Sequence, residues 1–106
     1  MKEKLTPREE KVAIYLREVC YGQAHAKKSA ELEPIFHMSA NDLRNVVNRL
    51  RRKSIPIASG QTGYFYAATA SEIYTTLLNL QGMIKGLEAA VYGLVRSFDD
   101  FGGESL

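Results

Sequence analysis

The chain has 106 residues, of which 45% are hydrophobic and 25% are charged, enough for one domain around a single core. No apolar run reaches the ~18 residues of a membrane span, and the charged start lacks the apolar segment of a secretory signal. We therefore expect a cytoplasmic protein with no membrane partner. Cys20 is the only cysteine, which excludes an intrachain disulfide and sites built from several thiolates.

Candidate catalytic and metal-binding residues are few. His25 and His37 lie far apart, and neither has a cysteine or a carboxylate cluster at metal-ligand spacing. No catalytic triad order, phosphate-binding glycine loop or pair of carboxylates is evident. The sequence therefore predicts neither an enzyme nor a bound metal or cofactor.

The net charge of +2 is unevenly distributed along the chain. Residues 1–26 hold five basic and four acidic groups, residues 27–53 hold seven and three, and residues 54–106 hold two and five. From Arg44 to Lys53 there are five basic residues and no acidic one. An anionic partner for this middle segment follows from that concentration of positive charge.

The first predicted element is a helix that begins after Thr6. Thr6 can cap it, Pro7 suits its first position, and Glu9 completes a capping box. Apolar residues then recur at helical spacing up to Val19, and Gly22 favours a stop.

The next segment is less regular. Residues 23–28 have no clear period and can hold a short strand. A second helix is expected from Ser29, as its cap, to about Phe36. Pro34 removes one backbone hydrogen bond there, so this helix should be short or distorted.

The third predicted helix is the most regular element of the first half. Ser39 can cap it, with Asp42 as a short version of the capping-box partner. One narrow apolar stripe then follows at helical spacing, formed by Leu43, Val46, Val47 and Leu50.

A β-hairpin is expected after the third helix. Residues 55–59 and 64–67 are β-branched and aromatic runs, and residues 60–63 between them favour a four-residue turn. The aromatic side chains of the second run are expected to close the core.

The last predicted element is a long helix. Thr69 and Glu72 form another capping box, and the helix should continue to about Phe98, followed by a flexible tail over residues 99–106. Apolar residues along it are spaced alternately by four and three, which is a heptad seam. The seam predicts self-association through Leu77, Leu80, Ile84, Leu87, Val91 and Leu94.

The order of elements is typical of a winged helix: helix, turn and helix, followed by a two-stranded wing. Residues 31–39 with 43–51 resemble the helix-turn-helix signature of bacterial and phage regulators. Residues 50–59, together with Gly63-Tyr64 at the close of the wing, resemble the winged helix of the biotin-operon-repressor class. Ser54 stands where that pattern usually has glycine. The resemblance implies a DNA-binding head over residues 1–70. Together with the heptad seam, which predicts an oligomerisation helix over 71–98, it gives a mainly α fold with a small hairpin (α+β).

The residues opposite the apolar stripe of the third helix are the candidate DNA contacts. Asparagine can bond bidentately to adenine and arginine to guanine, while flanking cations neutralise phosphates. The predicted base-reading residues are Asn41, Asn45, Asn48 and Arg52. The predicted phosphate contacts are Ser39, Arg44, Arg49, Arg51 and Lys53. The wing, which has no charged residue between Ser54 and Ser71, should contribute little.

These features predict a dimeric, sequence-specific, double-stranded-DNA-binding protein that acts as a bacterial or phage transcriptional regulator. One alternative is a phage replication or DNA-packaging factor of the small-terminase kind, which a ring-shaped oligomer would indicate. Another is a protein-interaction adaptor whose winged helix does not bind DNA. A weak response to DNA of any sequence would indicate this adaptor.

Overall fold

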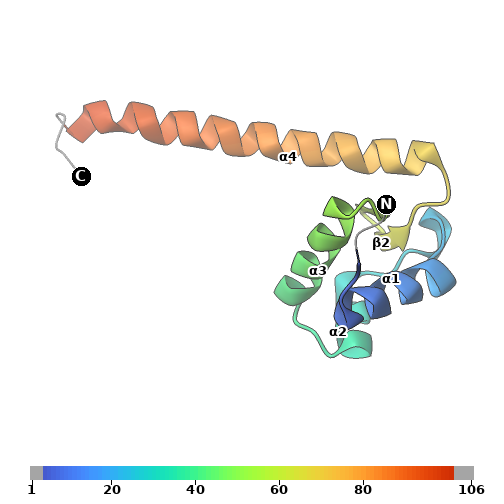
Figure 1. The fold of residues 1–106 in the computed structure, drawn as a ribbon. Helices are drawn as coiled ribbons and strands as arrows, with labels where there is room; N and C mark the ends of the chain where they lie inside the picture. The colour runs from blue at the N-terminus through green and yellow to red at the C-terminus, as the bar shows by residue number, and fades with distance from the viewer. Residues whose placement is uncertain (1–3, 102–106) are drawn as a thin grey trace. The chain divides into compact units, whose positions relative to one another are not determined.

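The computed structural model describes residues 4–101 as mainly α-helical, with one antiparallel hairpin and a long C-terminal helix, as predicted (Figure 1). The chain divides into two compact units, one ending at Thr76 and the next beginning at Leu77, so the division lies inside the last helix. The elements are α1 (Pro7–Val19), a 3-10 helix (Gln23–His25), α2 (Ser29–Phe36), α3 (Ala40–Arg52), β1 (Ile57–Gly60), β2 (Gly63–Tyr66), α4 (Ala70–Ser97) and a second 3-10 helix (Phe98–Phe101).

The helix starts follow the local capping chemistry. At α1 the Thr6 hydroxyl accepts from the Glu9 amide at 3.2 Å, and the Glu9 carboxylate accepts from the Thr6 amide at 3.1 Å. At α3 the Ser39 hydroxyl accepts from the amide of Asp42 at 3.1 Å. These two caps are as predicted, because each depends only on residues three positions apart.

α2 differs from its prediction at the first residue. Its cap is Lys28, whose amide donates to the Glu31 carboxylate at 3.2 Å, so Ser29 is the first helical residue and not the cap. Pro34 lies inside the helix. The predicted short length is confirmed, and the helix ends at His37, whose φ of 54° places it in the left-handed region.

The hairpin turn is shorter than predicted. Gly60 and Gly63 pair with each other, which leaves Gln61 and Thr62 as a two-residue turn where the sequence predicted four residues. Gly63 has a φ of 118°, and a Cβ there would overlap the Lys27 carbonyl. The turn is therefore set by a close backbone approach that only glycine permits.

The segment predicted to hold a short strand forms a 3-10 helix instead, followed by one isolated bridge. The backbones of Lys27 and Tyr64 exchange two hydrogen bonds, of 3.0 and 2.9 Å. On the N-terminal side, Cys20 accepts from the Tyr66 amide at 2.8 Å, and Gly22 donates to the Tyr66 carbonyl at 2.8 Å. The outer edge of β2 is thus covered by these backbone bonds.

The outer edge of β1 is covered by side chains. The amide of Ser59 donates to the Thr76 hydroxyl at 3.1 Å, and that hydroxyl donates to the Ser59 carbonyl at 3.3 Å. Arg51 donates from Nε to the carbonyl of Ile57 at 2.8 Å and from Nη2 to the Ser59 hydroxyl at 2.9 Å. These contacts satisfy edge groups that would otherwise be open to pairing with another strand.

The core lies between α1, α2, α3 and the hairpin (Figure 1). α1 packs against both α3 and β2, and α2 packs against α3. The apolar stripe predicted for α3 is fully buried. Of the three aromatic residues in β2, Phe65 is buried, whereas Tyr64 and Tyr66 are partly buried at the margin of the core. The buried hydrophobic residues are Val12, Ala13, Leu16, Cys20, Leu32, Phe36, Met38, Leu43, Val46, Val47, Leu50, Ile57, Ala58, Phe65 and Ala67.

The start of α4 is tied to the first unit, and only half of its predicted capping box forms. The Thr69 hydroxyl accepts from the amide of Glu72 at 3.2 Å as expected. The Glu72 carboxylate, however, accepts from the amides of Ala68 at 2.7 Å and Gln23 at 2.9 Å. Of the predicted tail over 99–106, the first residues belong to the 3-10 helix Phe98–Phe101, and residues 102–106 lie outside the described part.

Candidate nucleic-acid interface

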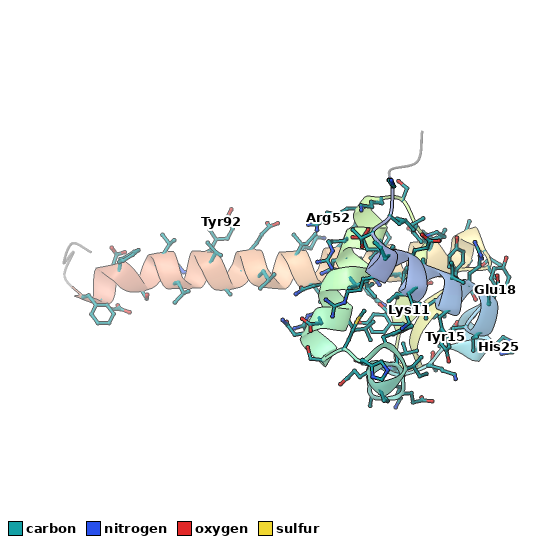
Figure 2. All side chains as sticks on the ribbon, turned by 60° about the horizontal axis from the view of Figure 1, so that its bottom comes forward. Lys11, Tyr15, Glu18, His25, Arg52 and Tyr92 are labelled. Atoms are coloured by element: carbon teal, nitrogen blue, oxygen red, sulfur yellow. The ribbon has the colours of Figure 1, made fainter. Side chains whose placement is uncertain are left out.

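α3 has one buried face and one outward face. Because Leu43, Val46, Val47 and Leu50 are buried, the side chains on the opposite side of the helix point outward. This outward face, formed by Asn41, Asn45, Asn48 and Arg52, is exposed throughout. Arg52 lies in the last turn of α3 and is labelled in Figure 2. We call these four residues the asparagine face.

The three asparagines differ in what their amides contact. The Asn41 side-chain oxygen accepts from Arg44 Nη2 at 2.7 Å, so one of its two polar groups is already bonded. Within residues 4–101, the side chains of Asn45 and Asn48 make no hydrogen bond to the protein. Bidentate contact with adenine needs both the amide oxygen and the amide nitrogen. Asn45 and Asn48 therefore have both amide groups open to a ligand, whereas the Asn41 oxygen is bonded to Arg44.

Two cations flank the asparagine face. At 3.6 residues per turn, Arg44 and Arg49 project about 70° to either side of its centre. Arg44 is exposed, and 40% of the Arg49 side chain is accessible. A helix lying in a groove has a phosphate strand on each side, so one cation beside each edge of the face suits such a ligand.

Arg49 and Lys53 share a buried carboxylate that the sequence did not reveal as their partner. Glu9 of α1 is only 1% exposed. Its Oε1 accepts from Lys53 Nζ at 2.6 Å, and its Oε2 accepts from Arg49 Nε at 3.1 Å. The hydrogen bond from Lys53 and that from the Thr6 amide hold the pKa of Glu9 below its usual value despite burial. The carboxylate is therefore charged, and it joins α1 to the end of α3.

Arg51 is directed toward the hairpin. Its guanidinium bonds to Ile57 and Ser59, and burial lowers its pKa from the usual value. Arg51 therefore fastens α3 to β1. The other predicted phosphate contacts remain at the surface to different degrees: Ser39 and Arg44 are exposed, and Arg49 and Lys53 are partly buried.

The wing tip offers little charge. Gln61 and Thr62 are exposed at the turn, and there is no charged residue from Ser54 to Ser71. Contacts from this turn to a nucleic acid would be limited to neutral side chains and backbone amides.

α4 carries a row of exposed apolar side chains. Leu80 is partly buried and the other predicted association residues are exposed, from 43% at Leu77 to 71% at Leu94. The helix has only four charged residues, Glu72, Lys85, Glu88 and Arg96. Exposed apolar side chains in such number are typical of surfaces that contact another molecule. The heptad seam is formed by Ile73, Leu77, Leu80, Ile84, Leu87, Val91, Leu94 and Phe98.

Further exposed apolar side chains lie outside the heptad seam. Tyr92, which is 62% exposed, is drawn on α4 in Figure 2. The other members of this set are Tyr74, Leu78, Met83 and Val95. The apolar surface of α4 is thus wider than the seam of a two-stranded coiled coil.

Three structural residues were not recognised from the sequence. Glu9 was recognised only as a cap, although its cationic partners lie 40 and 44 positions away. Thr76 and Arg51 close the outer edge of β1, which no local pattern indicates. The signal in the sequence was the spacing of Glu9, which lies three and seven residues before Val12 and Leu16 and so on the apolar side of the predicted helix.

Comparisons of the chain with protein-family models, with curated proteins and with solved structures give no match. Among residues 4–101, no helix combines the length and apolar character needed to span a membrane. In the same part of the chain, no three His, Cys, Asp or Glu side chains are grouped to hold a metal ion.

Proposed function

We propose that this protein is a sequence-specific double-stranded-DNA-binding protein, a dimeric transcriptional regulator of the bacterial or phage type. In this proposal the first unit is a winged helix, α3 enters the major groove, and α4 joins two copies. The observation that carries it is the asparagine face, exposed on a helix whose other side is buried and flanked by an arginine on each edge.

The chemistry of that face supports base contact. Asn45 and Asn48 present amides that have no hydrogen-bond partner among the described residues, and Arg52 lies on the same side of α3. These are the side chains that bond bidentately to adenine and guanine edges. A merely solvated face of a helix is usually more varied in charge, with acidic residues among the basic ones. On α3 the only acidic residue is Asp42, in the first turn.

The heptad seam supports the dimer. Positions 77, 84, 91 and 98 are Leu, Ile, Val and Phe, and positions 73, 80, 87 and 94 are Ile and three leucines. At positions 84 and 91 a β-branched residue alternates with leucine, a pattern that favours two strands in a parallel coiled coil. Burial against a second copy would contribute ~1.5–3 kcal/mol for each side chain that becomes fully buried.

The DNA proposal is tested by selecting preferred duplexes from random DNA with the purified full-length chain. On the selected site, Asn45→Ala or Asn48→Ala should weaken binding by ~1–3 kcal/mol and relax base preference at one position. The matched control is Asn79→Ala, which removes an exposed asparagine from α4. Selection that enriches no sequence, or equal losses on random and selected DNA, would contradict sequence-specific binding and favour the adaptor.

The dimer proposal is tested by light scattering of the same preparations. Leu87→Asp should dissociate the oligomer, because it would bury an unpaired charge in the seam. Ala89→Asp places the same charge on the opposite side of α4 and should leave a dimer intact. In a two-fold dimer the half-sites should lie about 10 base pairs apart or at a multiple of that spacing. A wild-type monomer at micromolar concentration would refute the proposal.

A DNA-packaging factor of the small-terminase kind is the second candidate, favoured by the width of the apolar surface on α4. Leu78 and Tyr92, each one position after a seam residue and pointing away from a partner helix, lie outside the heptad seam and would stay exposed in a two-stranded coil. A larger oligomer would cover them. A wild-type mass well above that of a dimer, together with dissociation by Ala89→Asp, would support this candidate over the regulator.

A further inference from the structure

We infer that Glu9 is a positioning residue for DNA-backbone contact, which holds the Arg49 guanidinium so that its two terminal nitrogens face a phosphate. This inference rests on the proposed function, because it concerns how one edge of the asparagine face meets the nucleic acid. It assigns a DNA-related role to a buried acid of α1, a helix that carries none of the predicted contacts.

The geometry divides the donors of Arg49 into two groups. Nε donates to Glu9 Oε2 at 3.1 Å, on the buried side. Within the described residues, Nη1 and Nη2 have no protein partner, and 40% of the side chain is exposed. The planar guanidinium is fixed at one edge and open at the other, which is the arrangement that binds a phosphate through two donors.

The rest of the Glu9 carboxylate is occupied, so it cannot turn away. Oε1 accepts from the Thr6 amide at 3.1 Å and from Lys53 Nζ at 2.6 Å. Lys53 also donates to the carbonyl of Lys4 at 3.1 Å, and its side chain is only 20% exposed. Lys53 therefore supplies most of the charge balance for the buried acid, and the more exposed Arg49 retains donors for a ligand.

Fixing Arg49 in advance matters for affinity. A free arginine side chain loses rotamer freedom when it binds, and prior ordering lowers that cost. The position of Arg49, at the edge of the asparagine face opposite Arg44, is where the second phosphate strand beside the helix would pass. If Arg49 served only to join α1 to α3, its Nε bond to Glu9 would be enough, and the exposed terminal nitrogens would have no role.

The test compares Arg49→Lys with Arg49→Gln in the full-length protein on the selected duplex. A lysine at position 49 has a single nitrogen, and when Glu9 holds that nitrogen its remaining donors lie beside the buried carboxylate, short of the place where the guanidinium presents Nη1 and Nη2. Both variants should therefore bind about tenfold more weakly. Both should also lower the slope of log affinity against log salt by about 0.9, although Arg49→Lys keeps the charge. The matched control is Arg17→Lys on α1, an exposed arginine paired with the exposed Glu18 at 3.2 Å, which should keep wild-type affinity.

A second measurement removes the acid. In a Glu9→Gln background, position 49 is released, so Arg49→Lys should cost less than threefold in place of about tenfold. If Glu9→Gln does not fold, as monitored by circular dichroism, the comparison of the two Arg49 variants still decides the question. Arg49→Lys with wild-type affinity and salt slope would overturn the inference, as would an equal loss in both backgrounds. A wild-type chain that binds no DNA would overturn the proposed function as well. If Asn48→Ala loses specificity while Arg49→Lys keeps wild-type affinity, this inference alone is overturned.

Discussion

Glu9 is a charged residue whose side chain is buried in the first unit. A buried carboxylate loses its hydration, and this cost is offset only when hydrogen bonds and opposite charges surround it. Here three donors, from Thr6, Lys53 and Arg49, meet the two oxygens. The carboxylate is at once the capping-box partner of Thr6 in α1 and the anchor for the last turns of α3.

The pH dependence of stability should reveal this environment. The pKa of Glu9 is lowered in the folded chain, chiefly by the hydrogen bond from Lys53. As the pH falls, the unfolded chain takes up its proton first, so the stabilisation is present above the usual glutamate pKa of ~4.3 and is lost as the pH falls toward the folded value. Glu9→Gln should be less stable than wild type at neutral pH, with a difference that shrinks in acid. Urea unfolding at several pH values measures it, and a pH-independent difference would contradict the assignment.

The two hairpin glycines should respond differently to alanine. Gly63 has a φ of 118° and faces the Lys27 carbonyl, whereas a Cβ at Gly60 would meet no atom within 4 Å. Gly63→Ala should lower the free energy of unfolding by ~2 kcal/mol or more through backbone strain and overlap. Gly60→Ala, the control, should change it by less than ~1 kcal/mol. Equal effects in urea denaturation would show that the turn relaxes.

At the scale of elements, α3 combines two functions on one helix. Its buried stripe packs against α1, α2 and β1, and its two edges are tied to neighbours, through Glu9 on one side and through Arg51 to the hairpin on the other. Within residues 4–101, the side chains of the asparagine face make no hydrogen bond to another element. The helix is therefore held firmly while its outward side chains remain available.

The ends of α2 and α3 carry strain that glycine would relieve. His37 and Ser54 have φ values of 54° and 66°, in the left-handed region. His37→Gly should raise the free energy of unfolding by about 1 kcal/mol, because a Cβ is disfavoured there. His37→Ala is the control and should give no gain, since it keeps the Cβ. Thermal or urea denaturation measures both, and equal stability of the two variants would show that the turn is unstrained.

At the scale of the whole molecule, α4 belongs to both units. Its first two turns are tied to the first unit through Glu72 and Thr76, and the second unit begins at Leu77. The helix continues through this point without a break. The predicted boundary between the head and the oligomerisation helix, at residues 70 and 71, thus lies before Thr76, whose hydroxyl bonds to Ser59 of the hairpin.

A truncation pair should separate these contacts from assembly. A chain ending after Asn79 keeps the Glu72 and Thr76 contacts, and a chain ending after Ala70 loses them. We expect the longer chain to be more stable by about 2 kcal/mol, at ~1 kcal/mol for each lost hydrogen-bonding residue. Thr76→Val in the longer chain should remove about half of that difference. Equal melting curves for the two truncated chains would contradict this role for the first turns of α4.

Much of the fold could be predicted because its signals are local. The Thr6 and Ser39 caps, the buried stripe of α3 and the heptad spacing of α4 each depend on residues a few positions apart. The predicted asparagine face is exposed for the same reason, since burial of one side of a helix determines the other.

What the sequence determined by itself was therefore the helices, the hairpin, the exposed asparagines and the apolar row on α4. Only the tertiary structure decided which basic side chains remain at the surface. Arg51 bonds to the hairpin. Arg49 and Lys53 both bond to the carboxylate of Glu9, which lies 40 and 44 positions away in the sequence. Arg44 remains exposed. Long, flexible basic side chains take whichever acceptor the folded chain brings within reach, and a buried acceptor such as Glu9 binds them most strongly because water does not compete there.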